Sequence, residues 1–391
     1  MSRDRRRRLR TACVDRRRDP TLGTRCGVQS APVTVTQMMQ ARAGNRPRPA
    51  LHVEPSTVHI VRSLDVTRWS AFVDGRPDAS IFHTVEMHRA FAEADRYRPV
   101  VWAAVDGGGE IRALLTPVEI STLGRPFRSL TTRSVAFAGP LLASDEDRGE
   151  ALETLLRAYQ RVNNRSSTLT EVRNVADPTD AASSFAACGF EHQAHLNFLV
   201  DLSSPEEELW SRVAQSARRN IRKARREGVT IEEAAESSEI REGYEVLRDV
   251  YHRIRVPLPD RSLFAACHRI LGPIGRFKVL LARRAGRTVG VLTLLLHNEV
   301  ITYWYTGTLR ESASTQAGDL LVWHAIASGH AAGYRTLDFG GAGVPNQSYG
   351  VRDFKAKYGG RLVDFGREVW VPSSLRLRIA KAGYEATRRF L

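Results

Sequence analysis

From about residue 65 onward, apolar positions along the chain follow two periods. Short runs rich in Val, Ile, Leu and aromatic residues, bounded by polar turns, predict strands at 99–105, 111–120, 135–142, 169–172, 196–202, 277–283, 288–296, 300–305, 334–339 and 361–371. Apolar residues three or four positions apart predict helices at 65–73, 82–94, 148–162, 181–188, 204–227, 239–254, 261–271, 319–332, 351–358 and 374–391. Hairpins and helices interleave, which is typical of an α+β fold.

The two halves of the chain place these elements in the same order: a hairpin, a third strand, a helix, a strand, a short helix ending in glycine, and a final strand. Phe185 and Phe354 anchor the two short helices, and Gly189 and Gly359 end them. A shared order over more than 100 residues indicates a duplicated unit. We predict a first domain at 55–203, a second at 204–372 and a basic C-terminal helix at 373–391.

The positive charge is concentrated at the N-terminus. The chain has a formal net charge of +15, and residues 1–50, with 13 arginines and three aspartates, carry +10 of it. This segment has few apolar residues, so we expect it to be disordered unless translation begins at Met38 or Met39. Because the remaining residues carry only +5, the overall basicity does not indicate nucleic-acid binding, and DNA is not expected as a partner.

No membrane span or metal site is predicted. The most apolar run, residues 289–296, is far shorter than the ~20 apolar residues that a spanning helix needs, so the expected location is the cytoplasm. The four cysteines lack CxxC spacing and a histidine cluster, which argues against a zinc site or a disulfide framework.

A basic helix is the first candidate for binding. Residues 218–226 hold six cations in nine residues, with Arg218, Arg222 and Arg225 on one face and an apolar stripe opposite (Val213, Ala217, Ile221, Ala224). Like charges at i,i+4 destabilise a helix by ~0.2–0.5 kcal/mol per pair, a cost that a bound anion would remove. We predict that Arg218 and Arg222 bind phosphate; the alternative is a solvated surface face.

Several motifs, in this order, resemble those of the Fem-type (FemAB-like) peptidyltransferases and related GNAT-like acyltransferases. They are Leu-Trp at 209–210, RRNIRKA at 218–224, YWYTG at 303–307, LDFGG at 337–341 and YGVRDFK at 349–355. The resemblance spans roughly 55–372 and implies two tandem GNAT-like (acetyltransferase) domains with a central cleft. The long coiled-coil arm of some members is absent here, which puts the use of tRNA in doubt.

The resemblance also implies an activity. Such enzymes transfer an aminoacyl group from aminoacyl-tRNA, or an acyl group from acyl-CoA, to an amine of a cell-wall or envelope precursor such as a peptidoglycan intermediate. No tightly bound cofactor is expected. The partner would be a phosphate-bearing small molecule or a lipid-linked precursor, with aminoacyl-tRNA and a peripheral membrane contact left open.

The resemblance places a functional lysine after a phenylalanine, at Lys355. The chain has only five lysines against 53 arginines, so Lys355 is not part of a general basic background. We assign it to stabilisation of an oxyanion or leaving group, which aminolysis requires. Asp338 is a candidate base or amine orienter. Tyr303 and Tyr305, expected on one face of their strand, and Tyr349 are candidate substrate contacts; packing in the core is the alternative.

Two rival functions remain. An acyl-CoA-dependent N-acyltransferase would act on a sugar amine or on an exopolysaccharide or lipid precursor. The turn at 314–319 argues against it, because Gln316 and Gly318 do not have the spacing of a pyrophosphate-binding loop and Asp319 adds a negative charge there. A non-enzymatic binder of RNA or membrane surfaces would use the N-terminal tail and the basic helix.

Overall fold

The computed structural model describes residues 58–121, 131–144 and 147–387, and Val53–Leu391 form one compact unit. The predicted tail at 1–50 lies outside the described residues. No helix in the described part of the chain is long and apolar enough to cross a membrane.

The second half of the chain is built on a seven-stranded sheet. Its strands, in spatial order, are β11 (Thr230–Glu233), β12 (Phe277–Arg284), β13 (Arg287–His297), β14 (Val300–Thr308), β15 (Thr336–Gly341), β10 (Leu196–Asp201) and β16 (Arg361–Asp364). All neighbours are antiparallel except β14 and β15, which are parallel. A parallel pair needs a crossover, and α10 (Ala317–Ala331) supplies it.

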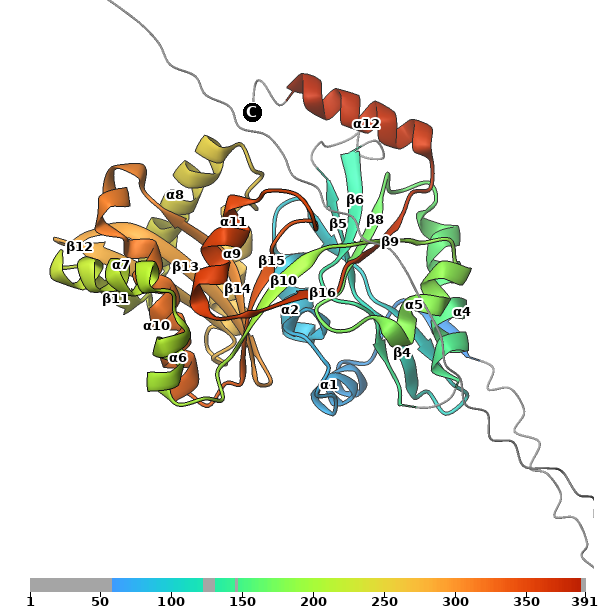
Figure 1. The fold of residues 1–391 in the computed structure, drawn as a ribbon. Coiled ribbons are helices and arrows are strands. Elements are labelled where there is room, and N and C mark those ends of the chain that lie inside the picture. The colour runs from blue at the N-terminus through green and yellow to red at the C-terminus, as the bar shows by residue number, and fades with distance from the viewer. Residues whose placement is uncertain (1–57, 122–130, 145–146, 388–391) are drawn as a thin grey trace, which may run out of the picture. The chain divides into compact units, whose positions relative to one another are not determined.

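Helices cover both faces of this sheet because its strands are apolar on both sides. α6 (Glu206–Arg212), α7 (Gln215–Arg226) and α10 pack on one face, where Ala217, Ile221 and Ala224 of α7 are buried as predicted. α8 (Ser237–Ile254) and α9 (Arg261–Leu271) pack on the other face (Figure 1).

The first half contains two sheets. One has the order β1 (His59–Val61), β3 (Trp102–Val105), β4 (Ile111–Leu115) and β7 (Leu141–Leu142). The other has the order β2 (Tyr97–Pro99), β5 (Pro117–Ser121), β6 (Thr132–Ala136), β8 (Thr170–Arg173), β17 (Arg367–Trp370) and β9 (Glu191–Gln193), with β6 and β8 parallel. Its helices are α1 (Val66–Asp74), α2 (Val85–Ala92), α4 (Arg148–Asn163) and α5 (Thr179–Ala187).

One hydrophobic core is shared by the two halves. Phe82, Phe91 and Val118 of the first half lie in the same buried cluster as Phe264 and Phe277 of the second. The ring of Phe91 stacks on that of Tyr97 with centroids 5.7 Å apart, and α2 packs against α9. The halves are therefore joined by core packing as well as by the chain.

The halves also exchange strands. β10, predicted to close the first half, lies between β15 and β16 in the sheet of the second half. β17, predicted as part of the last strand of the second half, lies between β8 and β9 in the first half, where the red strand of Figure 1 runs beside green ones. These two strand assignments were wrong because period-two alternation gives no information about pairing partners. The boundary at 203/204 stays a prediction, and two strands cross it.

Gly366 allows the chain to pass from one sheet to the other. It separates β16 from β17 with φ of +65°, and a Cβ at this position would overlap the ring of His192. Asn174, which follows β8, donates its side-chain amide to the Phe365 carbonyl (2.9 Å) and fixes the crossing point. The predicted strand at 361–371 is therefore two strands in two sheets.

Three other predicted elements are also interrupted. The strand at 111–120 breaks at Thr116, whose hydroxyl donates to the Phe82 carbonyl (3.0 Å), and that at 135–142 becomes β6 and β7. The helix at 204–227 breaks at Val213 and Ala214, where the Ala214 N–H donates to the Lys357 carbonyl (2.7 Å). The residues Ser204-Pro205-Glu206-Glu207 have the pattern of a capping box, but no side chain caps α6.

The C-terminal region contains α11 (Gly350–Lys355), a short 3-10 turn η3 (Ala356–Tyr358) and α12 (Ser374–Thr387). α11 and η3 together correspond to the helix predicted at 351–358.

The strand exchange predicts that a chain cut between Ser203 and Ser204 stays in one piece. Each fragment contributes a strand that is paired on both sides by the other, so the fragments should co-elute in size-exclusion chromatography. A protease site inserted at this position, with the uncut protein as the control, provides the measurement. Separate elution of folded fragments in buffer without denaturant would contradict the exchange.

Candidate active site

The parallel strands β14 and β15 separate before either of them ends. Their pairing stops at Thr302 and Asp338, although β14 continues to Thr308 and β15 to Gly341. On the other side of β15, the ladder with β10 shifts register between the pairs Leu199–Asp338 and Asn197–Gly341. The carboxyl-terminal end of β15 is thus irregular on both sides, and backbone groups there need other partners.

Lys355 supplies such a partner. It is the last residue of α11 and is 6% exposed, and its Nζ donates to the carbonyl oxygens of Phe339 (2.6 Å) and Gly341 (2.7 Å). An ammonium has three donors, so these two bonds leave a third for another acceptor. The predicted catalytic lysine is therefore held rigidly at the point where β14 and β15 separate.

Lys355 and Asp338 form an electrostatic pair. Burial lowers the pKa of Lys355 to about 8, and the negative charge of Asp338 limits this fall. Burial raises the pKa of Asp338 to about 6, opposed by the Gly340 N–H, which donates to Oδ1 (2.7 Å), and by Lys355. At neutral pH this arrangement favours a carboxylate beside an ammonium.

The glycine-rich segment after β15 is sharply turned, with positive φ at Gly340 (+65°) and Gly343 (+80°). The guanidinium of Arg352 holds it, donating to the carbonyls of Ala342 (2.8 Å), Val344 and Gln347 (3.0 Å). Sequence reasoning missed this role, although Arg352 lies within the motif that contains Lys355. The exposed ring of Tyr349 lies against Gly343, where a Cβ would approach its Cδ1 to 2.9 Å.

Tyr303 and Tyr305 do not share a face, and that prediction was wrong. The β13–β14 ladder pairs Leu294 with Tyr303 and Leu292 with Thr306, so Trp304 and Tyr305 both lie opposite Thr293. This β-bulge reverses the alternation of side chains. Tyr303 packs on Phe339 (5.1 Å between ring centroids), whereas Tyr305 packs on Phe264 (5.3 Å) in the core shared by the two halves.

Burial raises the pKa of both tyrosine hydroxyls. Tyr303, on the face that carries Phe339, lies next to the Lys355 site. Tyr305 lies on the opposite face and faces the sheet of the first half.

The arginines of α7 carry charge without counter-charge. Among the described residues, none of the six α7 cations forms an ion pair: Arg218, Arg219, Arg222, Lys223, Arg225 and Arg226. Three of these cations lie in the last turn, where the helix dipole favours them, but Arg218 and Arg222 do not. Arg222 lies over the ring of Trp210 (5.5 Å to the centroid). Arg218 and Arg222 therefore present positive charge that no carboxylate of the described protein neutralises, and an anion could bind to them.

The N-terminus of α10 differs from the prediction made for Asp319. Its carboxylate is buried, accepting hydrogen bonds from the Tyr358 hydroxyl (2.9 Å) and the Asn220 amide (3.3 Å). Burial raises the pKa of Asp319, and these two donors oppose the rise. The carboxylate is thus held by hydrogen bonds inside the protein.

Part of the chain matches a known family of domains. Residues 211–356 match the family described as "Acetyltransferase (GNAT) domain". This part of the chain therefore contains a domain similar to the GNAT-type acetyltransferases. The matched range runs from α6 to η3 and contains Lys355, Asp338 and the whole of α7. No curated protein sequence matches the chain significantly.

Three solved structures are similar to this chain at low sequence identity. FemX has a TM-score of 0.62 at 14% identity, covering 84% of this chain and 100% of its own. The C-terminal domain of a putative lysylphosphatidylglycerol synthetase from Agrobacterium fabrum has a TM-score of 0.50 at 15% identity, covering 82% and 95%. A tandem GNAT protein from the clavulanic acid biosynthesis pathway has a TM-score of 0.50 at 13% identity, covering 81% and 99%. These likenesses confirm the predicted α+β GNAT fold.

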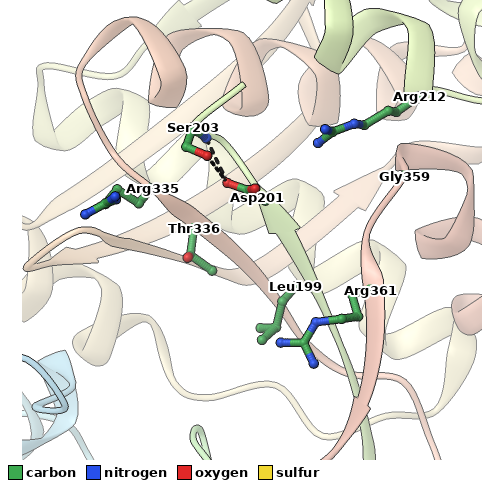
Figure 2. A pocket seen from close by; sticks show the side chains of 8 residues that line it. All are labelled: Leu199, Asp201, Ser203, Arg212, Arg335, Thr336, Gly359 and Arg361. Atoms are coloured by element: carbon green, nitrogen blue, oxygen red, sulfur yellow. Dashed lines mark hydrogen bonds between the residues drawn. The ribbon is translucent and has the colours of Figure 1, made fainter. Parts of the chain in front are cut away.

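The protein also has an open groove away from Lys355. Its volume is about 590 Å³, and it is lined by Leu199, Asp201, Ser203, Arg212, Arg335, Thr336, Gly359 and Arg361 (Figure 2). Asp201 accepts hydrogen bonds from the Ser203 backbone and hydroxyl (2.9 and 2.6 Å). The groove lies at the first residues of β15, whereas Lys355 binds its last ones. It contains none of the predicted site residues, so we do not place the reaction there.

The structure thus brings Lys355, Asp338, Tyr303 and Tyr349 together around the end of β15 in the GNAT domain. Arg218 and Arg222 lie on α7, which reaches the same region through the bond between Ala214 and Lys357. Sequence reasoning also missed His195. Its ring lies against Gly341, where a Cβ would be 2.6 Å from Nε2.

The bulge in β14 generates a stability prediction. The Tyr305 N–H donates to the hydroxyl of Thr293 (2.9 Å), which is fully buried. Thr293→Val keeps the shape but leaves this N–H without an acceptor, so the free energy of unfolding should fall by about 1–3 kcal/mol. Urea denaturation measures the change, with Thr302→Val on the neighbouring strand β14 as the control. Equal stability of the two variants would show that the bulge does not need the hydroxyl.

Proposed function

We propose that this enzyme forms an amide by transferring an aminoacyl or acyl group to an amine of a phosphate-bearing cell-wall or envelope precursor. The proposal is carried by the position of Lys355, a buried ammonium with one free donor where β14 and β15 separate. Aminolysis creates negative charge on one oxygen, and a fixed cation in a site of low dielectric stabilises that charge strongly.

The chemistry follows from these groups. The acceptor amine attacks the carbonyl carbon of the donor ester or thioester, and a C–N bond forms. The carbonyl oxygen becomes an oxyanion, to which Lys355 donates its third N–H. The C–O or C–S bond then breaks, and the proton lost by the amine leaves with the alcohol or thiol. Asp338 keeps Lys355 cationic and fixes Gly340; its predicted role as a base stays a prediction.

The phosphate of the proposed acceptor is supported by α7. Arg218 and Arg222 are unpaired in the described structure and belong to the matched GNAT domain. The name lysylphosphatidylglycerol synthetase, given to one similar structure, combines an aminoacyl group with a phospholipid. Both observations favour an acceptor that carries phosphate.

An acyl-CoA donor is the second candidate, and one observation favours it. The Asp319 carboxylate accepts from Tyr358 and Asn220, so it does not occupy the backbone N–H groups at the start of α10. The backbone N–H groups of Ala317 and Gly318 have no acceptor among the described residues. They can therefore donate to a pyrophosphate.

A thermal-shift comparison distinguishes the two donors. The ligands are CoA, acetyl-CoA, a non-hydrolysable aminoacyl-tRNA mimic and a UDP-linked muramyl peptide. A ligand at ~100 times its dissociation constant adds about 2.7 kcal/mol to the apparent stability. A shift with the tRNA mimic or the muramyl peptide but not with CoA supports aminoacyl transfer. A shift with CoA alone assigns the enzyme to the acyl-CoA class.

Replacement of Lys355 tests its role directly. Lys355→Met removes the ammonium, so kcat should fall about 10²–10³-fold while substrate affinity is retained. Circular dichroism and thermal melting establish that the variant is folded, because two carbonyls lose their donor. Lys357→Met, two residues away, is the matched control. Full activity in a folded Lys355→Met variant would exclude the proposed mechanism.

The pH dependence provides a second test. Since the ammonium of Lys355 persists only below a pKa of about 8, kcat should decline as the pH rises through this value. The carboxylate of Asp338 raises the pKa of Lys355, so Asp338→Asn should move the alkaline limb to lower pH. A pH profile of kcat for both proteins gives the result. An unmoved alkaline limb would mean that another group titrates.

A further inference from the structure

A second charged cluster lies on the sheet of the first half. Glu171 of β8 accepts hydrogen bonds from Arg173 Nε (2.6 Å) and from Arg367 Nη1 (3.1 Å). Arg367 belongs to β17, the strand that the second half contributes. Arg133 of β6 is exposed and acts electrostatically on both Glu171 and Arg367. Three guanidinium groups therefore surround one carboxylate.

The charge of this cluster is not balanced. Burial would raise the pKa of Glu171, but Arg173 and Arg367 outweigh it and lower the pKa, so the carboxylate supplies a full negative charge. His195 accepts from Arg367 Nη2 (2.8 Å), and burial, with Arg367 next, lowers its pKa to about 4. The histidine is therefore neutral. Its backbone N–H donates to the Asp364 carboxylate (2.8 Å), so three guanidinium groups lie near two carboxylates, and the cluster has an excess of one positive charge.

The ion-pair network around Arg283 has the opposite balance of charges, with more carboxylates than cations. Arg283 forms ion pairs with three carboxylates, those of Glu232 (2.7 Å), Glu239 (3.2 Å) and Glu242 (3.0 Å). Its single cation is fully surrounded by anions of the protein itself. The cluster around Glu171 has too few anions for its cations, and an added anion would complete it.

The guanidinium groups are fixed before any ligand arrives. Arg173 lies over the ring of Phe137 (5.1 Å to the centroid), and Arg367 is held between Glu171 and His195. The side chains of Arg173 and Arg367 are 33% and 25% exposed, so both can reach a ligand. Such preorganisation reduces the entropy lost on binding.

The cluster is joined to the Lys355 site by two short contacts. The ring of His195 lies against Gly341, and the Gly341 carbonyl accepts from Lys355 (2.7 Å). His195 and Gly341 therefore lie between Arg367 and the proposed catalytic ammonium.

We propose that Arg133, Arg173 and Arg367 form an oxyanion-binding subsite that holds a carboxylate or phosphate group of the acyl acceptor. The proposal rests on the proposed function and specifies the acceptor further. The acceptor is an anionic molecule that binds to the first half, in part through Arg367 of β17, the strand supplied by the second half. The planar guanidinium groups match the paired oxygens of either anion.

Isothermal titration of the full chain at about 0.15 M salt tests this subsite, with inorganic pyrophosphate and succinate as probes. Arg173→Gln and Arg367→Gln should each weaken binding about tenfold to a hundredfold. Glu171→Gln should strengthen it, because a competing carboxylate is lost. Arg283→Gln removes a comparable ion network and should leave binding unchanged. Tighter binding of pyrophosphate identifies a phosphate acceptor, and tighter binding of succinate a carboxylate acceptor.

Wild-type affinity in folded Arg173→Gln and Arg367→Gln variants would overturn the proposal. Loss of binding only in Arg222→Gln would also overturn it, because the anion would then bind to α7. In the acyl-transfer assay, Arg173→Gln should raise the acceptor KM with little change in kcat. The experiments test the proposed subsite and the proposed catalytic role of Lys355 independently of each other. Lys355→Met should lower kcat without changing the titration, whereas Arg173→Gln should weaken binding in the titration with little change in kcat.

Discussion

The reciprocal pairing of β10 and β17 is the constraint on which the rest of this structure depends. Each strand is hydrogen-bonded on both sides by strands of the other half, and a shared core that contains Phe91 and Phe264 also joins the halves. Local opening of either half therefore costs pairing energy in both. The irregular end of β15 and the arginines of β8 and β17 belong to this joint framework, so their relative positions are fixed by the backbone.

Two physical features make the end of β15 suitable for chemistry. A regular sheet satisfies its own backbone groups and leaves nothing for a substrate. Here β14 separates from β15, β10 shifts register, and a buried ammonium takes over two carbonyls. Asp338 and the dipoles of the two carbonyls offset part of the free energy that burial of the Lys355 ammonium costs. The ammonium keeps one N–H donor that no group in the described part of the protein uses.

Local sequence signals identified most elements, but not how the elements pair. The resemblance to Fem-type enzymes, together with the scarcity of lysines, selected Lys355, whose catalytic role stays a prediction. The exchange of β10 and β17 was not predictable, because pairing between distant strands leaves no trace in the alternation of either one. The break at Val213 and Ala214 contains no glycine or proline; its cause is a bond to Lys357, more than 140 residues away. The bulge opposite Thr293 likewise depends on a neighbouring strand.

The position of β17 near the end of the chain has a consequence for synthesis. While the ribosome is still translating the second half, β8 and β9 have been made, but the strand that lies between them has not. Until residue 370 has emerged, β8 and β9 have no strand between them, and the edges that will pair with β17 remain exposed. The last tenth of the polypeptide thus acts as the closing piece of its earliest-made half, and premature termination anywhere before that point leaves an aggregation-prone edge.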